Sequence, residues 1–316
     1  MTPIDQIQKA FESGKISGSW LIVGGYEYEK KNFISNACSI ILNQNINMDF
    51  SFHPNIKWIE CGLTEEAKKE IQKNILAGKG VETEVEYERK REITVDDVRS
   101  GIQFLSLKSD STQSRILIIY PADKMNENAA NALLKVLEEP PQNSVLFLLC
   151  QNLGKLLPTI KSRCRQIAIK PLSAKDLMYQ IQRKYPMIED IDLVVSLARG
   201  SLGLAMEICE NDGLALYHEM LSLLKLQQEI PLESLKEFSD KLVKDENAFN
   251  LFKKFMLDWL CEQTKKYALV SPFIAEDYMD LYQEVHKLFS DIDRIYLDKK
   301  QVIQTIFFKV GELIND

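Results

Sequence analysis

The chain has 316 residues, of which 45% are hydrophobic and 27% are charged, an ordinary globular composition that excludes a wholly disordered protein. Asp and Glu outnumber Lys and Arg by 46 to 39, so the formal net charge is −7 and the chain lacks the overall basic field of a DNA-binding protein. At roughly 150 residues per domain, the length predicts about two domains or three small ones.

Hydropathy and the spacing of Cys and His residues argue against a transmembrane, secreted or metal-binding protein. The sequence holds no apolar run long enough for a transmembrane helix, and its first residues, Met1–Asp5, lack the pattern of a signal peptide, so we expect a cytoplasmic protein. The six cysteines are scattered without a C-x-x-C pair and the three histidines lie far apart. We therefore expect no metal site.

Strand-like and helix-like segments alternate over the first 170 residues, which predicts a parallel sheet with helices on both faces. Segment 65–92 is too densely charged to bury much and is predicted as a solvated helix with a mobile connection. The remaining elements expected here are, in chain order, a helix capped by Thr2, a strand over 20–23, a helix over 29–42, a strand over 55–60, a helix from Thr94 to 107, a strand over 115–120, a helix from Asn126 that Pro140 stops, and strands over 144–150 and 165–169.

After Pro171 the pattern becomes entirely helical. The first group of helices, over about 173–183, 188–198 and 201–209, predicts a small three-helix unit. Five further helices are expected over about 214–229, 231–244, 246–267, 274–289 and 298–314. The sequence thus predicts three domains, 1–170, 171–211 and 212–316.

Gly24 and Gly25 stand between a strand and a helix, the setting of a phosphate-binding loop. The motif G-x-x-x-x-G-K-[ST] holds phosphates with backbone N–H groups and Lys, and Mg²⁺ with a hydroxyl. Gly24 and Lys30 are in register with it, but Glu29 replaces the second glycine and Lys31 the hydroxyl residue. A carboxylate repels phosphates and a side chain crowds the turn, so we expect a degenerate loop without nucleotide.

The strand over 115–120 has the shape of a Walker B strand but lacks its acids. A working site needs one carboxylate at the end of the strand for Mg²⁺ and a second to activate water. The strand ends in Tyr120 and Pro121, and only Asp123 follows. We therefore expect the fold of such a site without its chemistry.

Segment 156–165 predicts a short helix between two strands, with Arg163 near its end. The planar, permanently charged guanidinium suits stabilisation of a transferring phosphoryl group, whereas an exposed Arg at a helix end is commonly a solvated cation. Spacing alone leaves both interpretations open. Cys164 lacks a predicted His base nearby, so we do not expect it to act as a nucleophile.

Four segments together resemble one family. The run Asn128–Pro141 resembles the NALLKxLEEPP signature of bacterial clamp-loader AAA+ subunits, and Leu156–Cys164 resembles their SRC motif. Ile93–Arg99 is similar to the helix start before the family's Walker B strand, and His53–Asn55 to the His-Pro-Asp ahead of its second strand. The resemblance is dense from about 50 to 170, and the helical remainder matches in layout.

By this resemblance, 1–170 would be an AAA+ RecA-like α/β domain, 171–211 a helical lid and 212–316 an all-α collar domain for oligomerisation. The family's gamma/tau ATPase has an intact P-loop, several Walker B acids and a four-cysteine zinc module. Its delta-prime type often lacks ATP binding yet keeps the SRC arginine, and this chain resembles that type. Gly200–Ala205 resembles the start of the sensor 2 helix, without the Arg that ATPase subunits place after it.

The resemblance also implies a role in DNA replication. Such subunits form a five-membered ring with gamma/tau and delta subunits, which loads a sliding clamp on primed DNA, without contact with a membrane. ATP and Mg²⁺ would sit on neighbouring subunits and none on this chain, which would not be an enzyme by itself. Arg163 would act in trans as an arginine finger, Ser162 and Cys164 would set the packing of its loop, and Lys135 would contact DNA phosphate or be solvated.

Plainer and competing interpretations remain beside this one. Leu133, Leu134 and Leu137 are expected in the core, and Glu138 and Glu139 as a helix-end charge pair, since neighbours on a helix point about 100° apart. The alternative functions are an ATP-binding gamma/tau-like subunit with an atypical P-loop and a stand-alone DNA-binding module. The lost loop residues count against the first, and the acidic charge balance counts against the second.

Overall fold

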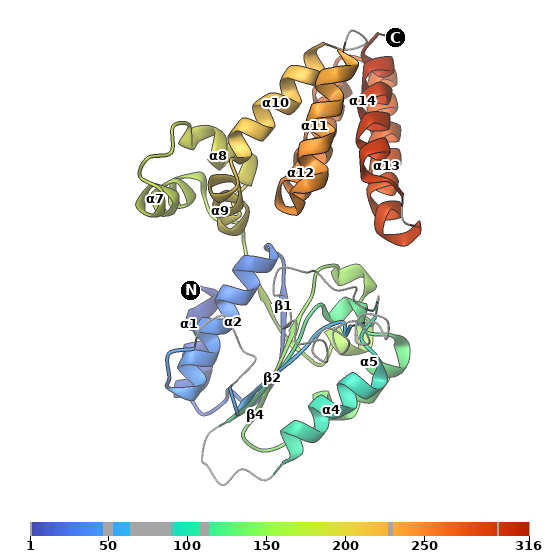
Figure 1. Cartoon of the computed structure of the whole chain (residues 1–316). Coiled ribbons are helices and arrows are strands. Elements are labelled where there is room, and N and C mark those ends of the chain that lie inside the picture. The colour runs from blue at the N-terminus through green and yellow to red at the C-terminus, as the bar shows by residue number, and fades with distance from the viewer. Residues whose placement is uncertain are drawn as a thin grey trace, which may run out of the picture. The chain divides into compact units, whose positions relative to one another are not determined.

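The structure, a computed structural model, describes residues 2–46, 53–63, 90, 92–107, 114–226, 230–295 and 297–315. They fall into two compact units, Met1–Pro171 and Leu172–Asp316 (Figure 1). Most of the charged segment 65–92, predicted as a solvated helix and connection, lies outside the described residues. Among the helices that are described, none is long and apolar enough to cross a membrane.

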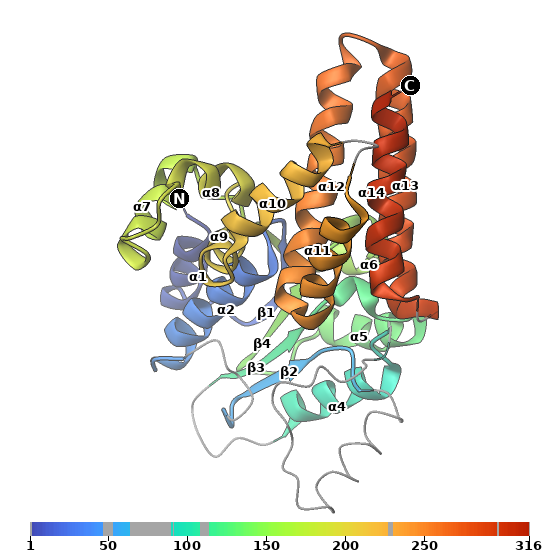
Figure 2. The same ribbon diagram turned by 45° about the horizontal axis from the view of Figure 1, so that its top comes forward.

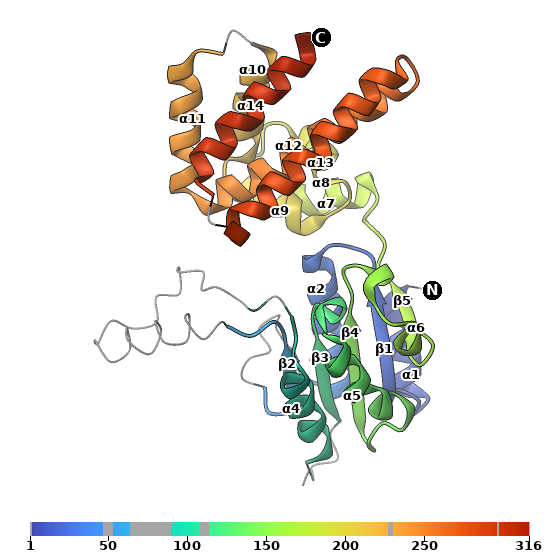
Figure 3. The ribbon, with the colours of Figure 1, turned by 90° about the vertical axis from the view of Figure 1, so that its right-hand side faces the viewer.

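The first unit is built on a five-stranded sheet with the order β2-β3-β4-β1-β5, which runs from left to right in Figure 3. Every neighbouring pair is parallel, which confirms the predicted parallel sheet. The strands are β1 (Gly18–Val23), β2 (Ile56–Ile59), β3 (Arg115–Ile119), β4 (Ser144–Leu149) and β5 (Arg165–Ala168).

Alternation along the strands produces two separate cores, one on each face of the sheet. On one face, α1 (Pro3–Glu12) and α2 (Glu27–Leu42) pack against strand residues that include Phe147. On the other, α4 (Val95–Ser106), α5 (Glu127–Glu138) and α6 (Pro158–Lys161) pack against residues that include Leu146 and Leu148. Two short 3-10 turns, η1 (Ala122–Lys124) and η2 (Leu153–Lys155), follow β3 and β4.

Three helices of this unit, α1, α4 and α5, start at the predicted capping residues. Thr2 forms a capping box with Asp5, and Thr94 forms one with Asp97, so that two orphan N–H groups are satisfied in each case. The side chain of Asn126 accepts a hydrogen bond from the backbone N–H of the third helical residue of α5. These helices therefore begin where local hydrogen bonding dictates.

The second unit is entirely helical. Its core is a single buried cluster that draws on residues of every helix and is rich in aromatic contacts, with Phe252 5.7 Å from Phe238 and 6.0 Å from Phe307 between ring centroids. The long helices α12 and α13 pack along each other (Figure 2). The helices are α7 (Ala174–Lys184), α8 (Ile191–Ala198), α9 (Leu202–Glu210), α10 (Gly213–Lys225), α11 (Leu232–Lys244), α12 (Glu246–Ala268), α13 (Pro272–Ile295) and α14 (Lys299–Asn315).

These helices confirm the predicted all-α architecture after Pro171. Helix α13 is longer than predicted, since it begins at Pro272 and continues to Ile295. The predicted division between a lid and a collar at 211 stays a prediction, because the buried cluster continues from α7 to α14.

Candidate functional site

The residues in P-loop and Walker B register lie at the carboxyl edge of the sheet, where parallel α/β folds bind their ligands, whereas Arg163 directly precedes β5 and so lies at the opposite edge. In the strand register, Val23 of β1 is beside Ala168 of β5, and Ile119 of β3 is beside Leu148 of β4. The residues that follow these strand ends therefore share one edge. Helix α2 begins directly after the β1 turn.

The glycine turn after β1 is shaped by its contact with the end of β5. Gly24 and Gly25 have φ values of +71° and +61°, in the left-handed region. A Cβ on Gly24 would lie 2.7 Å from the carbonyl oxygen of Ile169, and one on Gly25 would lie 2.9 Å from its side chain. The N–H of Ile169 donates to the carbonyl of Val23 at 2.8 Å, which ties the two segments together. Both glycines thus have a packing requirement within the chain itself.

The lysine in P-loop register is directed at carbonyls of its own chain. Lys30 is 3% exposed, and its Nζ donates to the carbonyls of Cys150 at 3.1 Å and Gly25 at 3.4 Å. Burial lowers its pKa, because it disfavours the charged form, and the nearby Asp123 and Glu27 offset part of that effect.

A hydrogen-bond network occupies the end of β3. The Tyr120 hydroxyl donates to Glu27 Oε2 at 2.9 Å and accepts from Gln151 Nε2 at 2.7 Å. The backbone N–H of Gln151 donates to Asp123 Oδ1 at 2.7 Å, and Lys31 Nζ lies 2.6 Å from Glu27 Oε1. Burial favours a raised pKa for Glu27, but Lys31 and Tyr120 outweigh it and hold that pKa below its ordinary value.

The charged groups at this edge of the sheet differ from those of a P-loop site. Glu27 and Glu29 place two carboxylates in the first turn of α2, where a P-loop helix receives phosphates. Asp123, the first acid after β3, already accepts the backbone N–H of Gln151. Among the described residues, no group of three His, Cys, Asp or Glu side chains is placed to hold a metal ion.

The SRC segment lies against the last turn of α5. Arg163 donates from Nε to Glu138 Oε1 at 2.6 Å, its Nη2 lies 2.6 Å from the same oxygen, and its Nη1 donates to the carbonyl of Thr159 at 3.1 Å. Its side chain remains 35% exposed. The interpretation of Glu138 as only half of a helix-end charge pair missed this contact, because the two residues are 25 positions apart in the chain.

The neighbours of Arg163 in the SRC motif make local contacts. Ser162 Oγ donates to the carbonyl of Thr159 at 3.1 Å. Cys164 packs against the core beneath α5 and α6, and burial raises the pKa of its thiol to about 12. A thiol with so high a pKa has little thiolate at neutral pH, which agrees with the expectation that it is not a nucleophile.

Several other predicted residues have plain structural surroundings. Leu133 and Leu137 are buried and Leu134 is partly buried, whereas Lys135 and Glu139 are exposed.

The sequence analysis did not identify Gln151 as a site residue, although its position after β4 and Cys150 could have indicated it.

Two segments that resemble motifs of the family have polar anchors. The ring of His53 accepts from the backbone N–H of Asn55 at 3.2 Å, as a turn residue would. Ser201 caps α9, and Arg199, which precedes it with a φ of +47°, pairs with Asp258 at 3.3 Å and Glu262 at 3.0 Å. Helix α9 itself carries no Arg.

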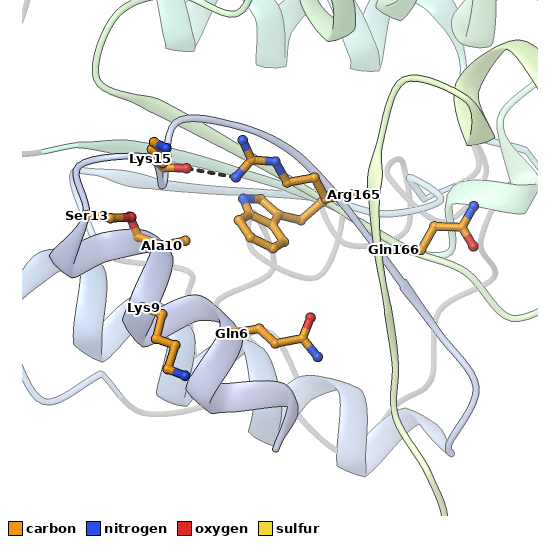
Figure 4. Close-up of a pocket in the computed structure, with 8 residues that line it drawn as sticks. Gln6, Lys9, Ala10, Ser13, Lys15, Arg165 and Gln166 are labelled. Carbon is orange, nitrogen blue, oxygen red and sulfur yellow. Dashed lines mark hydrogen bonds between the residues drawn. The ribbon is translucent and has the colours of Figure 1, made fainter. Parts of the chain in front are cut away.

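A shallow cavity of about 340 Å³ lies between α1 and the exposed edge strand β5 (Figure 4). Lys9, Lys15 and Arg165 line it. The guanidinium of Arg165 donates to the carbonyl of Lys15 at 2.9 Å and lies 5.2 Å from the ring of Trp20. No predicted site residue lines this cavity.

The comparisons with known proteins agree with the resemblance in the motifs. A family model described as DNA polymerase III, delta subunit, matches residues 2–173. DNA polymerase III subunit delta' of Pseudomonas aeruginosa is 38% identical over 116 residues, which cover 36% of this chain and 35% of that protein. The Escherichia coli subunit delta' is 32% identical over 124 residues, 39% of this chain and 37% of that protein. The chain thus matches about a third of the length of these curated relatives.

A solved structure extends the likeness to the whole fold. The Thermotoga maritima protein described as related to the DNA polymerase III gamma subunit is 18% identical, and the match covers 98% of this chain and 99% of that one with a TM-score of 0.52. At that identity the likeness concerns the fold alone. It agrees with a parallel α/β unit followed by helices.

Proposed function

This chain belongs to the DNA polymerase III delta-subunit family, among relatives of the bacterial clamp-loader subunit delta-prime, and we propose that it serves a clamp loader without binding ATP itself. The observation that carries the proposal is that Lys30 is buried and Arg163 is exposed. Lys30, in P-loop register, is buried against carbonyls of its own chain, whereas Arg163 is exposed at the surface.

The proposal that this chain binds no ATP is supported by charge and hydrogen bonding at the sheet edge. A triphosphate at the start of α2 would face the carboxylate of Glu27, which is already engaged by Tyr120 and Lys31. The ammonium of Lys30 would have to leave two carbonyl oxygens and would leave that of Cys150 without this donor. Both changes oppose nucleotide binding.

The role for Arg163 is to act on ATP bound by a neighbouring subunit. Arg has five N–H donors, of which Nε donates to Glu138 and one on Nη1 donates to the Thr159 carbonyl, while Nη2 also lies close to Glu138, so at least two remain for a phosphate. The guanidinium fork is suited to the charge that develops on a transferring phosphoryl group. The chain would thus supply an arginine finger, while ATP and Mg²⁺ sit on the neighbour.

The partners proposed on the same basis are gamma/tau and delta subunits, with the sliding clamp and primed DNA reached through the assembly. Helices α10–α14 would join the collar. Lys135 is exposed on α5, where it is available for a DNA phosphate. The cytoplasmic location stays a prediction.

Titration of the isolated chain with a fluorescent ATP analogue in Mg²⁺ tests the first half of the proposal. We expect no saturable binding up to millimolar analogue, whereas the gamma/tau subunit measured in parallel should bind. Saturable binding that excess ATP reverses would favour the alternative of a gamma/tau-like subunit with an atypical P-loop.

Reconstitution with gamma/tau, delta, clamp and primed DNA tests the second half. Arg163→Ala removes an ion pair whose members are 35% and 51% exposed, so its cost in stability should stay below about 1 kcal/mol and the ring should assemble. ATP turnover should fall at the site next to this chain, where a trans-acting arginine is worth roughly 10³- to 10⁵-fold. Lys161→Ala, which removes a neighbouring cation, is the control. Unchanged turnover in Arg163→Ala rings would refute the role of this residue.

A further inference from the structure

We propose that Glu138 is a positioning residue for Arg163: its carboxylate holds the guanidinium so that two N–H donors are presented to a phosphoryl group on the neighbouring subunit. The inference rests on the proposed function of Arg163 and adds a second residue to it. It derives from one ion pair that joins two signature segments, the end of α5 and the turn after α6.

The ion pair fixes one edge of the guanidinium. Nε and Nη2 of Arg163 both lie 2.6 Å from Glu138 Oε1, and Nη1 donates to the Thr159 carbonyl at 3.1 Å. A free Arg side chain samples many rotamers, and ordering it costs conformational entropy. Here that cost is met before a partner arrives, so the remaining donors meet a phosphate already oriented.

Both partners are anchored by core residues close to them in the chain. Glu138 is the last residue of α5, whose Leu137 is 5% exposed, and Pro140 prevents the helix from continuing. Arg163 follows the single turn of α6, whose Ile160 is fully buried. The carboxylate and the guanidinium are therefore attached to two fixed points of one core.

The geometry favours positioning over blocking. Glu138 accepts from Nε and lies beside Nη2, and Thr159 accepts one Nη1 hydrogen. At least one donor on each terminal nitrogen remains, and Arg offers such donors to phosphate oxygens. A blocking carboxylate would instead take both terminal nitrogens.

The neighbouring residue provides a matched control. Glu139 is exposed, and its side chain makes no hydrogen bond or ion pair with any residue that the structure describes. Glu138→Gln and Glu139→Gln each remove one negative charge at the same helix end without changing side-chain size. Only the first removes a charged partner of Arg163.

The test compares wild type, Glu138→Gln, Glu139→Gln, Arg163→Ala and the double variant Glu138→Gln/Arg163→Ala in the full reconstituted loader. The turnover that depends on the finger is the difference between wild type and Arg163→Ala. Misplacement by about 1 Å can cost up to about 100-fold, and since Thr159 still holds one edge, we expect Glu138→Gln to lower this turnover about tenfold in kcat. The KM for ATP and the assembly of the ring should not change.

Two further results are expected together. Glu139→Gln should match wild type, and the double variant should match Arg163→Ala, because Glu138 would act only through Arg163. A merely structural role of Glu138 would lower the rate of the double variant further. Unchanged or raised turnover in Glu138→Gln, with Arg163→Ala impaired, would overturn the positioning role of Glu138 and would leave the arginine-finger role of Arg163 supported. Unchanged turnover in Arg163→Ala would overturn both.

Discussion

Replacing Gly24 by alanine tests whether the turn after β1 is shaped by its contact with β5. Two costs follow from the structure. The φ of +71° places a Cβ in the left-handed region, and the new atom would lie 2.7 Å from the carbonyl oxygen of Ile169. That carbonyl belongs to a residue whose N–H is bonded to Val23 at 2.8 Å, so it cannot move aside without disturbing the β1–β5 pairing.

The two costs can be estimated separately. Left-handed backbone costs an ordinary residue about 1 kcal/mol. Overpacking that displaces backbone costs a further 1–3 kcal/mol, roughly. Gly24→Ala should therefore destabilise the first unit by about 2–4 kcal/mol.

Gly14 provides the control, because it has nearly the same backbone angle without the contact. Its φ is +68°, and an added Cβ would meet nothing within 4 Å. Gly14→Ala should therefore cost only about 1 kcal/mol.

Urea unfolding in a Trp259→Phe background, followed by the fluorescence of Trp20 and Trp58, reports on the unit Met1–Pro171. Equal losses of unfolding free energy in Gly24→Ala and Gly14→Ala would refute the argument that the contact with Ile169 requires a glycine.

Three more predictions concern titratable groups of the first unit. The pKa of Glu27 is lowered in the folded chain. The ionised carboxylate therefore stabilises the fold above the ordinary glutamate pKa, and this stability is lost as pH falls through the lower folded value. Glu27→Gln should reduce the loss of unfolding free energy in urea melts from pH 7 to 3. The pKa of Lys30 is also lowered, here by burial, so near that pKa the unfolded chain binds a proton that the folded chain has lost. The free energy of unfolding should therefore rise as the pH approaches about 10.4, the unfolded lysine pKa, and Lys30→Met should remove this rise. The pKa of Cys164 is raised to about 12, so iodoacetamide at pH 8 should label it slowly in the native chain and rapidly in urea.

Each of these has a result that would count against it. An identical acid dependence in wild type and Glu27→Gln would mean that the carboxylate gains nothing from Lys31 and Tyr120. A flat alkaline profile in wild type would contradict the buried ammonium of Lys30. Native labelling of Cys164 as fast as in urea would mean that its burial is not maintained in solution.

The amino-acid sequence determined the local elements of this protein. Apolar strands that alternate with helices predicted the parallel sheet. The helix starts could be predicted because capping residues such as Thr94 and Asn126 bond to backbone groups three residues away. The lost glycine and hydroxyl at Glu29 and Lys31 likewise indicated a degenerate P-loop from spacing alone. Such signals are readable because every partner lies within a few residues.

The contacts that define the site were decided only by the tertiary structure. Lys30 reaches a carbonyl 120 positions away, Gln151 reaches a tyrosine 31 positions away, and Glu138 pairs with an arginine 25 positions away. Each partner is selected by the order of the strands, which brings the ends of β1, β3 and β4 to one edge and the end of α5 beside α6. A charged side chain in the sequence offers the same donors to any acceptor, and only the packed sheet decides which acceptor lies within reach.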